Sequence, residues 1–178
     1  MTEDRVVRDA DRPGDAGACA AIYAPYVTDT AISFETVAPS AEEMAQRIER
    51  ARRTHAWLVL EEAGAVVGYA YAGPFRERAA YRWSCEVSVY LKQDHGRRGG
   101  GRLLYDALLE RLVERGYRTA AAGMTLPNAA SERFHEAMGF EPVGTYRGIG
   151  WKHGRWRDVA WAQKALVPSD EGDPAPPS

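Results

Sequence analysis

Residues 84–116 read SCEVSVYLKQDHGRRGGGRLLYDALLERLVERG, and the expected fold is built outward from this stretch. Cys85–Leu91 alternates between two kinds of side chain, which is typical of a β-strand with two different faces. Four glycines and three arginines follow within His95–Arg102. Leucines at helical spacing then predict a helix to about Arg115, and Gly116 is expected to end it. The stretch therefore predicts a strand, a glycine-rich turn and a helix in direct succession.

The glycine-rich turn does not match the two common phosphate loops. A Walker loop ends in Gly-Lys-Ser/Thr, whereas Gly101 is followed here by Arg102 and Leu103. A dinucleotide fingerprint needs a third glycine at the position of Leu104. A flexible linker does not fit either, because strand and helix patterns adjoin the turn on both sides.

A helix that begins at this turn directs its free amides and the positive end of its dipole at whatever binds there. Glycines let a backbone approach a ligand closely, and the arginines add cationic donors. We therefore predict a site for a diphosphate or a similar anion. The alternative is a glycine-rich turn whose arginines are solvated. The residues expected to bind the anion are Arg97, Arg98, Gly99, Gly100, Gly101 and Arg102.

The remaining patterns predict one mixed α/β domain over residues 1–166, with a single central sheet. Helices are expected from Pro13, with Asp11 as a candidate cap, and from a capping box at Ser40. A short helix is expected to follow Asn128. The expected strands are Arg5–Asp9, Ala56–Glu61, Val66–Ala72, Cys85–Leu91, Thr119–Leu126, Glu141–Trp151 and Asp158–Leu166, with turns at Ala63-Gly64 and His153-Gly154.

Composition limits the classes of function. The chain of 178 residues has a net charge of −2 and a pI near 6.1, so broad nucleic-acid binding lacks electrostatic support. Cys19 and Cys85 give no disulfide framework and suit a reducing cytoplasm. The polar N-terminus lacks a signal-peptide core, and no window approaches an apolar membrane span. We expect a cytoplasmic protein without nucleic-acid or membrane partners, and a disordered Pro-rich tail at 167–178.

A second segment, NAASERFHEAMGF at residues 128–140, follows the helix and a further strand. Together with the 84–116 stretch, it resembles the GNAT acetyltransferases. The resemblance implies the α/β (α+β) GNAT fold, a central mixed and mostly antiparallel sheet of about seven strands flanked by about four helices. It also implies acetyl-CoA as the co-substrate, with no metal.

The family's pyrophosphate signature, Gln/Arg-x-x-Gly-x-Gly/Ala, falls on Gly96, Gly99 and Gly101. Gly96 departs from the signature, since the family normally has Gln or Arg there. Asn128 matches the asparagine that contacts the cofactor region in the family. The family also binds the pantetheine arm of its cofactor along the strand before the turn, which implicates Val89, Tyr90 and Leu91.

Six blocks narrow the resemblance to the phosphinothricin N-acetyltransferases, over about residues 5–166. The blocks are SFET, GPFRERAAYRW, SCEVSVYL, TLPNAAS, RFHEAMGF and GWKHGRWRDV. That subfamily includes enzymes that act on methionine sulfoximine and methionine sulfone. The resemblance implies acetylation of the α-amine of a small glutamate-like amino acid, and a homodimer.

Glu86 is the predicted catalytic base. Alternation along the strand places Glu86 and Ser88 on the face opposite Cys85. A carboxylate on such a strand is costly unless it faces a cleft or a partner. An α-amine with a pKa near ~7.7–8.0 must lose a proton before it attacks, and a carboxylate can accept that proton. The alternative is a structural ion pair with Arg82, but Glu86 also matches the position of the subfamily's proposed base.

His135 is predicted to be a catalytic or positioning residue. Most GNAT enzymes carry at this place a tyrosine that is proposed to protonate the leaving thiolate, and the phosphinothricin-type enzymes resemble this chain in having histidine. A histidine can donate or accept a proton near neutral pH. The alternative is a helix histidine in a satisfied polar contact. Tyr105, on the core face of its helix, is predicted only to pack.

The loop before the Glu86 strand is predicted to bind the substrate. Arginine forks match carboxylate or phosphinate oxygens with two parallel hydrogen bonds, and the alternative is a solvated basic loop. The hairpin at Trp151–Asp158 has no metal spacing and is expected to shape the site or a dimer contact. The residues expected on the substrate side are Phe34, Arg76, Arg78, Tyr81, Val87 and Ser88.

Two other functions stay open on the sequence. The same fold could acetylate another amine, such as an antibiotic or a peptide N-terminus. From a different class, the chain could be a non-catalytic acyl-CoA-binding module, although Glu86 beside an intact cofactor strand favours the enzyme. Direct attack by the amine is expected, because no activated Ser or Cys nucleophile is evident and Cys85 points away from Glu86.

Overall fold

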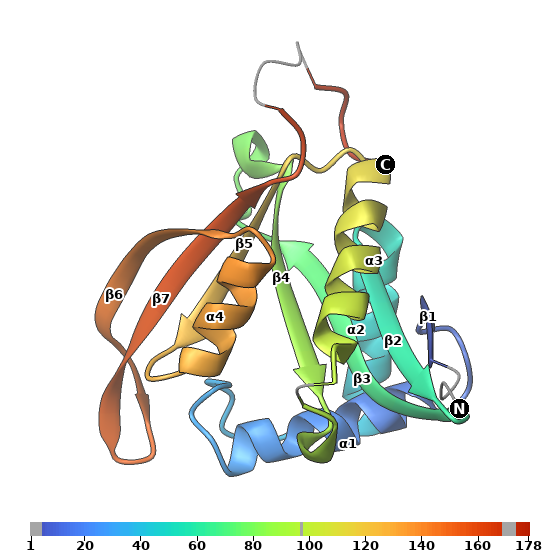
Figure 1. The fold of residues 1–178 in the computed structure, drawn as a ribbon, viewed down its shortest axis with the longest axis vertical. Coiled ribbons are helices and arrows are strands. Elements are labelled where there is room, and N and C mark those ends of the chain that lie inside the picture. Colours follow the sequence, from blue (N-terminus) through green and yellow to red (C-terminus); the bar gives the residue numbers. More distant parts are fainter. Residues whose placement is uncertain (1–4, 97, 169–173) are drawn as a thin grey trace.

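One sheet organises the part of the chain that the computed structural model describes, residues 5–96, 98–168 and 174–178 (Figure 1). In these residues seven strands follow the order β1-β2-β3-β4-β5-β7-β6, and every neighbouring pair is antiparallel except β4 with β5. The strands are β1 Arg5–Asp9, β2 Ala56–Glu62, β3 Ala65–Pro74, β4 Ser84–Leu91, β5 Thr119–Thr125, β6 Glu141–Lys152 and β7 Arg155–Ala165.

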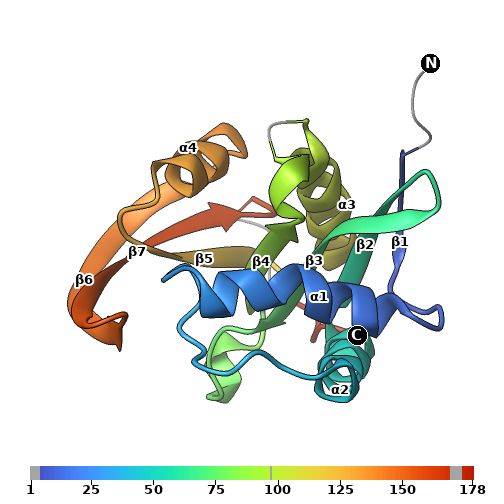
Figure 2. The ribbon, with the colours of Figure 1, turned by 90° about the horizontal axis from the view of Figure 1, so that it is seen from below.

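Helices cover both faces of this sheet. Figure 2 shows α1 and α2 on one face and α3 and α4 on the other. One apolar core lies under α3 and includes Leu104, Leu108 and Leu112, and a second lies under α1 and α2 and includes Met44 and Ile48. The predicted fold, the order of its elements and the apolar face of α3 are confirmed. The α-helices of the described residues are α1 Asp15–Thr28, α2 Ala41–Thr54, α3 Gly100–Glu114 and α4 Ala129–Ala137.

Both predicted hairpin turns are present, at Ala63-Gly64 and His153-Gly154. Their φ angles are all positive, 49° and 81° in the first turn and 51° and 71° in the second. Two-residue hairpin turns need this left-handed backbone, because it matches the twist of the flanking strands. The second turn is so tight that Lys152 pairs with Arg155, and β7 therefore begins earlier than the predicted Asp158.

The start of α1 differs from the prediction. The helix begins at Asp15 with Gly14 as its N-cap, so Asp11 is not the cap and Pro13 lies outside the helix. Asp15 is buried, and the guanidinium of Arg8 donates to both of its carboxylate oxygens, at 2.8 and 2.9 Å. Gly14 has φ 95°, which is outside the helical range, so the helix starts only after it, and the ion pair ties that start to β1.

The C-terminal end of the chain returns to the main fold. Trp83 Nε1 donates to the carbonyl of Ala175 at 2.8 Å, and the amide of Ser178 donates to the carbonyl of Arg115 at 3.0 Å. These contacts belong to the 167–178 tail, for which composition predicts disorder and part of which lies outside the described residues. Backbone hydrogen bonds, which composition does not report, hold the end of the tail.

Replacing Ser40 by alanine is expected to lower the free energy of unfolding by about 1 kcal/mol. In the capping box, which is present as predicted, Ser40 Oγ accepts from the Glu43 amide at 3.1 Å, and the Glu43 carboxylate accepts from the Ser40 amide at 2.7 Å. Ser40→Gly is the matched control, with a loss of roughly a few tenths of a kcal/mol. Urea unfolding of the two variants makes the comparison, and equal losses would contradict a stabilising role for the side-chain cap.

Candidate active site

The sheet opens between β4 and β5. Within the described residues these strands pair in parallel only from Ser84 to Glu86 on β4, opposite Thr119 to Ala121 on β5. Beyond Glu86, β4 continues along β3 while β5 continues along β7, so the two strands diverge (Figure 1). We call the resulting cavity the β4–β5 gap. It brings together the predicted site residues Val87, Ser88, Val89, Tyr90, Asn128 and His135.

Glu86 lies where the two strands part. It is half-buried between its strand neighbours Gly73 on β3 and Ala121 on β5. Burial raises the pKa of its carboxyl above the ordinary value, and the positive charge of Arg76 acts in the opposite direction. Arg82, the predicted alternative partner, instead donates to a carbonyl of its own loop at 3.0 Å. Glu86 is therefore the last residue of β4 before the gap, next to Val87 and Ser88, which line it.

The two faces of β4 are occupied as the alternation predicts. Cys85 and Val87 are buried in the core under α3. On the other face, the ring of Tyr90 packs edge-on against Tyr23 and Tyr26, with ring centres 4.9 and 5.0 Å apart. The Tyr90 ring therefore belongs to the core under α1, and the contact of this residue with a cofactor stays a prediction.

His135 lines the gap from α4 and is only 5% exposed. Its Nδ1 lies 2.8 Å from the carbonyl oxygen of Ser131, and its Nε2 lies 3.1 Å from the hydroxyl of Tyr105. A carbonyl can only accept, so Nδ1 carries the hydrogen and Nε2 accepts from the tyrosine. Burial lowers the pKa of the ring, which favours this neutral form. Tyr105 packs in the core as predicted, but its hydroxyl contact with His135 was missed.

The glycine-rich turn leads directly into α3. Gly99 is the N-cap, with φ 79°, a conformation that favours glycine. A Cβ at Gly100 would lie 2.8 Å from the side chain of Leu60, and one at Gly101 would lie 3.2 Å from Phe134. These two glycines therefore let α3 approach Leu60 and Phe134 closely, and the predicted approach of the turn to an anion stays a prediction. The amides of the first turn of α3 still have no partners within the helix.

The arginines around the turn differ in their contacts. Arg102 donates to a carbonyl at the C-terminal end of α4, at 3.1 Å. The carbonyl of Arg98 accepts from the guanidinium of Arg5 at 2.6 Å, and Arg5 also pairs with the buried carboxylate of Glu62 at 3.2 Å. Arg97 lies outside the described residues. The turn is thus tied to β1 and β2 on one side and to α4 on the other.

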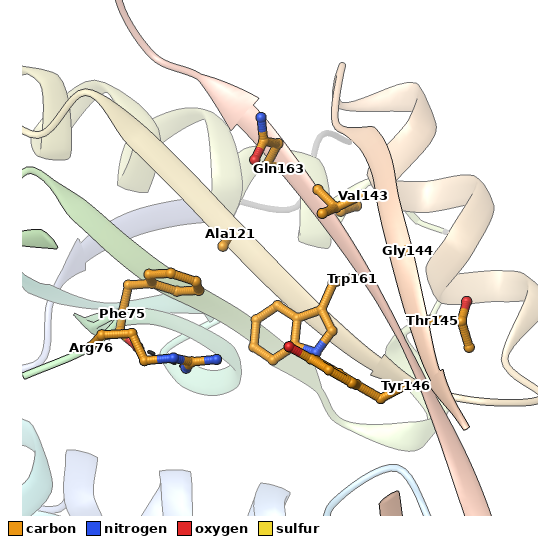
Figure 3. A pocket seen from close by; sticks show the side chains of 10 residues that line it. Phe75, Arg76, Ala121, Val143, Gly144, Thr145, Tyr146, Trp161 and Gln163 are labelled. Carbon is orange, nitrogen blue, oxygen red and sulfur yellow. Dashed lines mark hydrogen bonds between the residues drawn. The ribbon is translucent and has the colours of Figure 1, made fainter. Parts of the chain in front are cut away.

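An aromatic pocket lies beside the gap. Figure 3 shows Phe75 and Arg76, from the end of β3, facing Trp161 of β7 and Tyr146 of β6. The guanidinium carbon of Arg76 lies 4.5 Å from the ring centre of Phe75 and 5.9 Å from that of Trp161, within the range of cation–π attraction. Ala121, the β5 neighbour of the candidate base, lines the same pocket. Neither Trp161 nor Tyr146 was predicted.

The other predicted substrate residues are spread over two segments. Tyr81 stands edge-on to Phe75, with ring centres 5.7 Å apart. The side chain of Arg78 is exposed, and its carbonyl accepts from the Tyr81 amide at 2.9 Å. Phe34, between α1 and α2, lies so close to Gly150 on β6 that a Cβ there would be 2.2 Å from its ring. The structure therefore places Arg76 in the wall of the aromatic pocket, Tyr81 behind Phe75 of that wall, and Phe34 on the β6–β7 hairpin.

Two further features concern metals and membranes. Among the described residues, no three His, Cys, Asp or Glu side chains are grouped as a metal ion would need. In the same part of the chain, none of the helices has the length and apolar character to cross a bilayer.

Comparison with known proteins places the chain in a family. The family model described as the acetyltransferase (GNAT) domain matches residues 9–161. The chain belongs to the GNAT acetyltransferases. This N-acetyltransferase is 39% identical over 169 residues to a phosphinothricin N-acetyltransferase from Streptomyces viridochromogenes, covering 93% of this chain and 90% of that protein. It is 38% identical over 168 residues to an L-methionine sulfoximine/L-methionine sulfone acetyltransferase from Pseudomonas paraeruginosa, covering 92% and 95%.

Solved structures agree with the assignment of this acetyltransferase. A GNAT superfamily phosphinothricin acetyltransferase from Sinorhizobium meliloti, in complex with AcCoA, has a TM-score of 0.88 at 34% identity and covers 96% of this chain and 93% of that one. A Salmonella typhimurium protein solved with its cofactor acetyl-CoA has a TM-score of 0.90 at 31% identity, with coverages of 96% and 98%.

His135→Gln in the acetyltransferase is expected to reduce the loss of stability on acidification. Burial lowers the pKa of His135 in the folded state, whereas an unfolded histidine titrates near ~6.5. Below that pH the unfolded chain binds a proton that the folded chain does not, so the free energy of unfolding falls, by up to about 1.4 kcal/mol per pH unit. His55, whose pKa burial lowers to about 4, contributes equally to both proteins. Urea unfolding between about pH 7 and pH 5 gives the slopes, and identical slopes would contradict a neutral His135.

Proposed function

We propose that this acetyltransferase moves the acetyl group of acetyl-CoA to the α-amine of a small glutamate-like amino acid, of the phosphinothricin, methionine sulfoximine or methionine sulfone type. The observation that carries the proposal is the half-buried Glu86 at the opening of the β4–β5 gap, with Arg76 in the adjoining aromatic pocket. The names of the relatives support this class of substrate.

The residues of the gap fit acetyl-CoA, which when bound supplies the acetyl group as a thioester. The first-turn amides of α3, at Gly99–Arg102, suit a diphosphate. Past Glu86, the described part of β4 has no β5 partner, so the backbone of Val89, which points away from β3, is open to an extended arm. The carbonyl of Leu91 already accepts from the hydroxyl of Tyr26 at 2.6 Å, which leaves its amide for such an arm.

Asn128 contributes to the same side of the gap. Its Oδ1 accepts from the amide of Ser131 at 3.2 Å and so caps α4. The side-chain nitrogen of Asn128 is therefore the group that we propose for contact with the cofactor, and the cap holds it in place.

Glu86 is the proposed general base. An amine attacks only as the free base, and an α-amine is mostly protonated at pH 7. The carboxylate of Glu86 takes the proton from the substrate nitrogen, and its raised pKa makes it a stronger base than an exposed carboxylate. Arg76 offers a fork of donors to a carboxylate or phosphinate oxygen of the substrate, with Arg78, Tyr81 and Phe34 in the outer walls.

The His135–Tyr105 pair is proposed to act on the leaving-group side. Because Nε2 accepts from the tyrosine, the ring of His135 fixes the direction of the Tyr105 hydroxyl at the wall of the gap. The single hydrogen of that hydroxyl is directed at Nε2, so this hydrogen bond fixes the orientation of the His135 ring, and we propose His135 as a positioning residue. Ser88 and Val87 line the same cavity on β4.

The β6–β7 hairpin is the proposed homodimer contact. Large apolar side chains on it are 53–64% exposed, an arrangement that marks surfaces of protein association. Both cysteines of the chain are buried and free, which suits the reducing cytoplasm that we propose as its location. The exposed apolar residues of the hairpin are Val143, Tyr146, Ile149, Trp151 and Trp156.

Glu86→Gln is expected to reduce kcat by about 10²-fold at neutral pH while acetyl-CoA binding is unchanged, because only proton removal is lost. Thiol release with phosphinothricin, methionine sulfoximine and methionine sulfone measures turnover, and calorimetry measures binding. Wild-type kcat/KM is expected to fall on the acid side with a pKa above the ordinary glutamate value, and the variant to lack that limb. Glu110→Gln, on the solvent face of α3, is the matched control.

The outcomes separate the competing functions. Wild-type turnover of other amines but none of these three would reject the proposed substrate class and leave a different GNAT activity. Binding of acetyl-CoA with no turnover of any amine would indicate a non-catalytic acyl-CoA-binding module. Equal rates for Glu86→Gln and the wild type would reject Glu86 as the base.

Trp156→Ser is expected to weaken the homodimer, because this ring is exposed and stands edge-on to Trp151, with centres 5.3 Å apart. Sedimentation equilibrium of the wild type and the variant measures the dissociation constant, with a rise of at least about tenfold expected for loss of a central aromatic contact. A monomeric wild type would reject the dimer, and an unchanged constant would reject this face.

A further inference from the structure

Lys152, the last residue of β6, is a buried cation that the proposed chemistry does not use. The residue is 5% exposed. Its Nζ donates to the carbonyl oxygens of Val27 at 2.6 Å, of Ser33, and of Glu35 at 2.8 Å. An ammonium group has three hydrogens, and all three are bonded here. This saturation is what makes burial of the charge tolerable.

Several neighbours of Lys152 offset part of the cost of burying its charge. Val27 lies in the last turn of α1, where the free carbonyls form the negative end of the helix dipole. Burial lowers the pKa of Lys152, and the carboxylate of Glu35 acts against that shift. Glu35 is held in turn by Arg47, at 2.6 and 2.9 Å, and by the hydroxyl of Tyr23 at 2.9 Å. The contact is therefore part of a fixed network.

The three carbonyls belong to one stretch, Val27–Glu35, which we call the 27–35 segment. From Thr30 onward it has no helix or strand of its own, so its position depends on such contacts. Ile32 lines the β4–β5 gap, and its carbonyl accepts from the hydroxyl of Thr125 on β5 at 3.3 Å. Phe34 is the residue proposed above for the substrate wall. The segment thus borders the site directly.

The tip of the β6–β7 hairpin holds the segment by a second contact. His153, the residue after Lys152, has its Nε2 3.0 Å from the carbonyl of Thr30. Higher on the same hairpin, Gly150 provides the space in which the Phe34 ring rests. The hairpin and the segment therefore form one unit, with Lys152 at its most buried point.

We propose that Lys152 is a positioning residue for the amino-acid side of the active site. By fixing the 27–35 segment, it sets where Ile32 and Phe34 lie beside the gap. The identity of the ligand rests on the proposed function, whereas the positioning itself does not. None of these contacts involves the α3 turn, so the proposal implies a defect in amino-acid binding with acetyl-CoA binding preserved.

The test compares Lys152→Met, Lys152→Arg and a control, Arg115→Met. Methionine keeps the unbranched stem and removes all three donors, and the planar fork of arginine cannot direct donors to three converging carbonyls. Arg115 also donates to carbonyls at a helix C-terminus, those of Arg52 at 3.2 Å and Arg53 at 3.3 Å, but at the end of α2. It therefore controls for the general loss of a cation–carbonyl contact.

For Lys152→Met we expect the KM for the amino acid to rise at least about tenfold, with the Kd for acetyl-CoA changing by less than about twofold. Hydrogen exchange without ligands should accelerate at the amides of residues 30–36 and stay unchanged in β4. Lys152→Arg should change the amino-acid KM and the exchange at residues 30–36 in the same direction, by smaller amounts. The increase in the amino-acid KM caused by Phe34→Ala should be smaller in the Lys152→Met background than in the wild type, since both changes act through one wall.

Unchanged KM and unchanged exchange in Lys152→Met would overturn the proposal. So would a uniform acceleration of exchange with parallel changes in both substrates, because that pattern indicates a general structural role. If the methionine variant does not fold, the same measurements on Lys152→Arg decide, and an unchanged amino-acid KM there overturns the proposal. If the wild type acetylates none of the tested amino acids, the proposed function fails, and exchange at residues 30–36 alone still decides whether Lys152 positions the segment.

Discussion

The site depends on one constraint, the loss of pairing between β4 and β5 after Glu86. In the described residues β4 stays in register with β3 as far as Leu91, and β5 stays with β7 as far as Thr125, so the two halves of the sheet separate. A strand edge inside a sheet carries N–H and C=O groups that need other partners. An extended ligand arm can supply them, as in β-strand addition. The same opening begins directly after Glu86, whose pKa is raised by burial and which we propose as the base.

The direction of α3 is set by the packing of its core face, and this direction in turn places the amides at the start of the helix. Leu104 and Leu108 fix the helix on the sheet, and the missing side chains of Gly100 and Gly101 allow the close approach. The amides of the first turn consequently lie at a fixed place relative to the end of β4. Tyr105 extends this logic, because a ring on the same buried face carries its hydroxyl to His135 on α4. One packing face thereby orients both the proposed anion-binding end of the helix and a polar group of the gap.

Features with a local cause could be predicted from the sequence. The capping box at Ser40 and the tight hairpin turns depend on residues a few positions apart, and Glu86 is a carboxylate on an otherwise apolar strand. The predicted start of α1 was wrong, because Gly14 adopts φ 95° before the helix and no local pattern shows that Asp15 pairs with Arg8 of β1. The run of glycines correctly predicted a close approach of the backbone at this turn, but no local pattern indicates which residues the backbone approaches. Gly96 has φ −65°, and a Cβ built there would meet nothing within 4 Å. The backbone therefore does not require glycine at this position, where the family normally has Gln or Arg.

Lys152 and Trp161, on the proposed amino-acid side, could not be predicted for a related physical reason, because their contacts join distant segments. Lys152 binds carbonyls between 117 and 125 residues away, and Trp161 meets Phe75 across the sheet. The proposed cofactor side, by contrast, is built mainly from one continuous stretch, 84–102, through backbone amides and a strand edge. The backbone groups of the proposed cofactor side do not depend on the identity of its side chains. The wall of the proposed amino-acid side, in contrast, consists of side chains from three separate segments. Selection of the amine can therefore change through the loops and the hairpin while β4 and the α3 turn stay as they are.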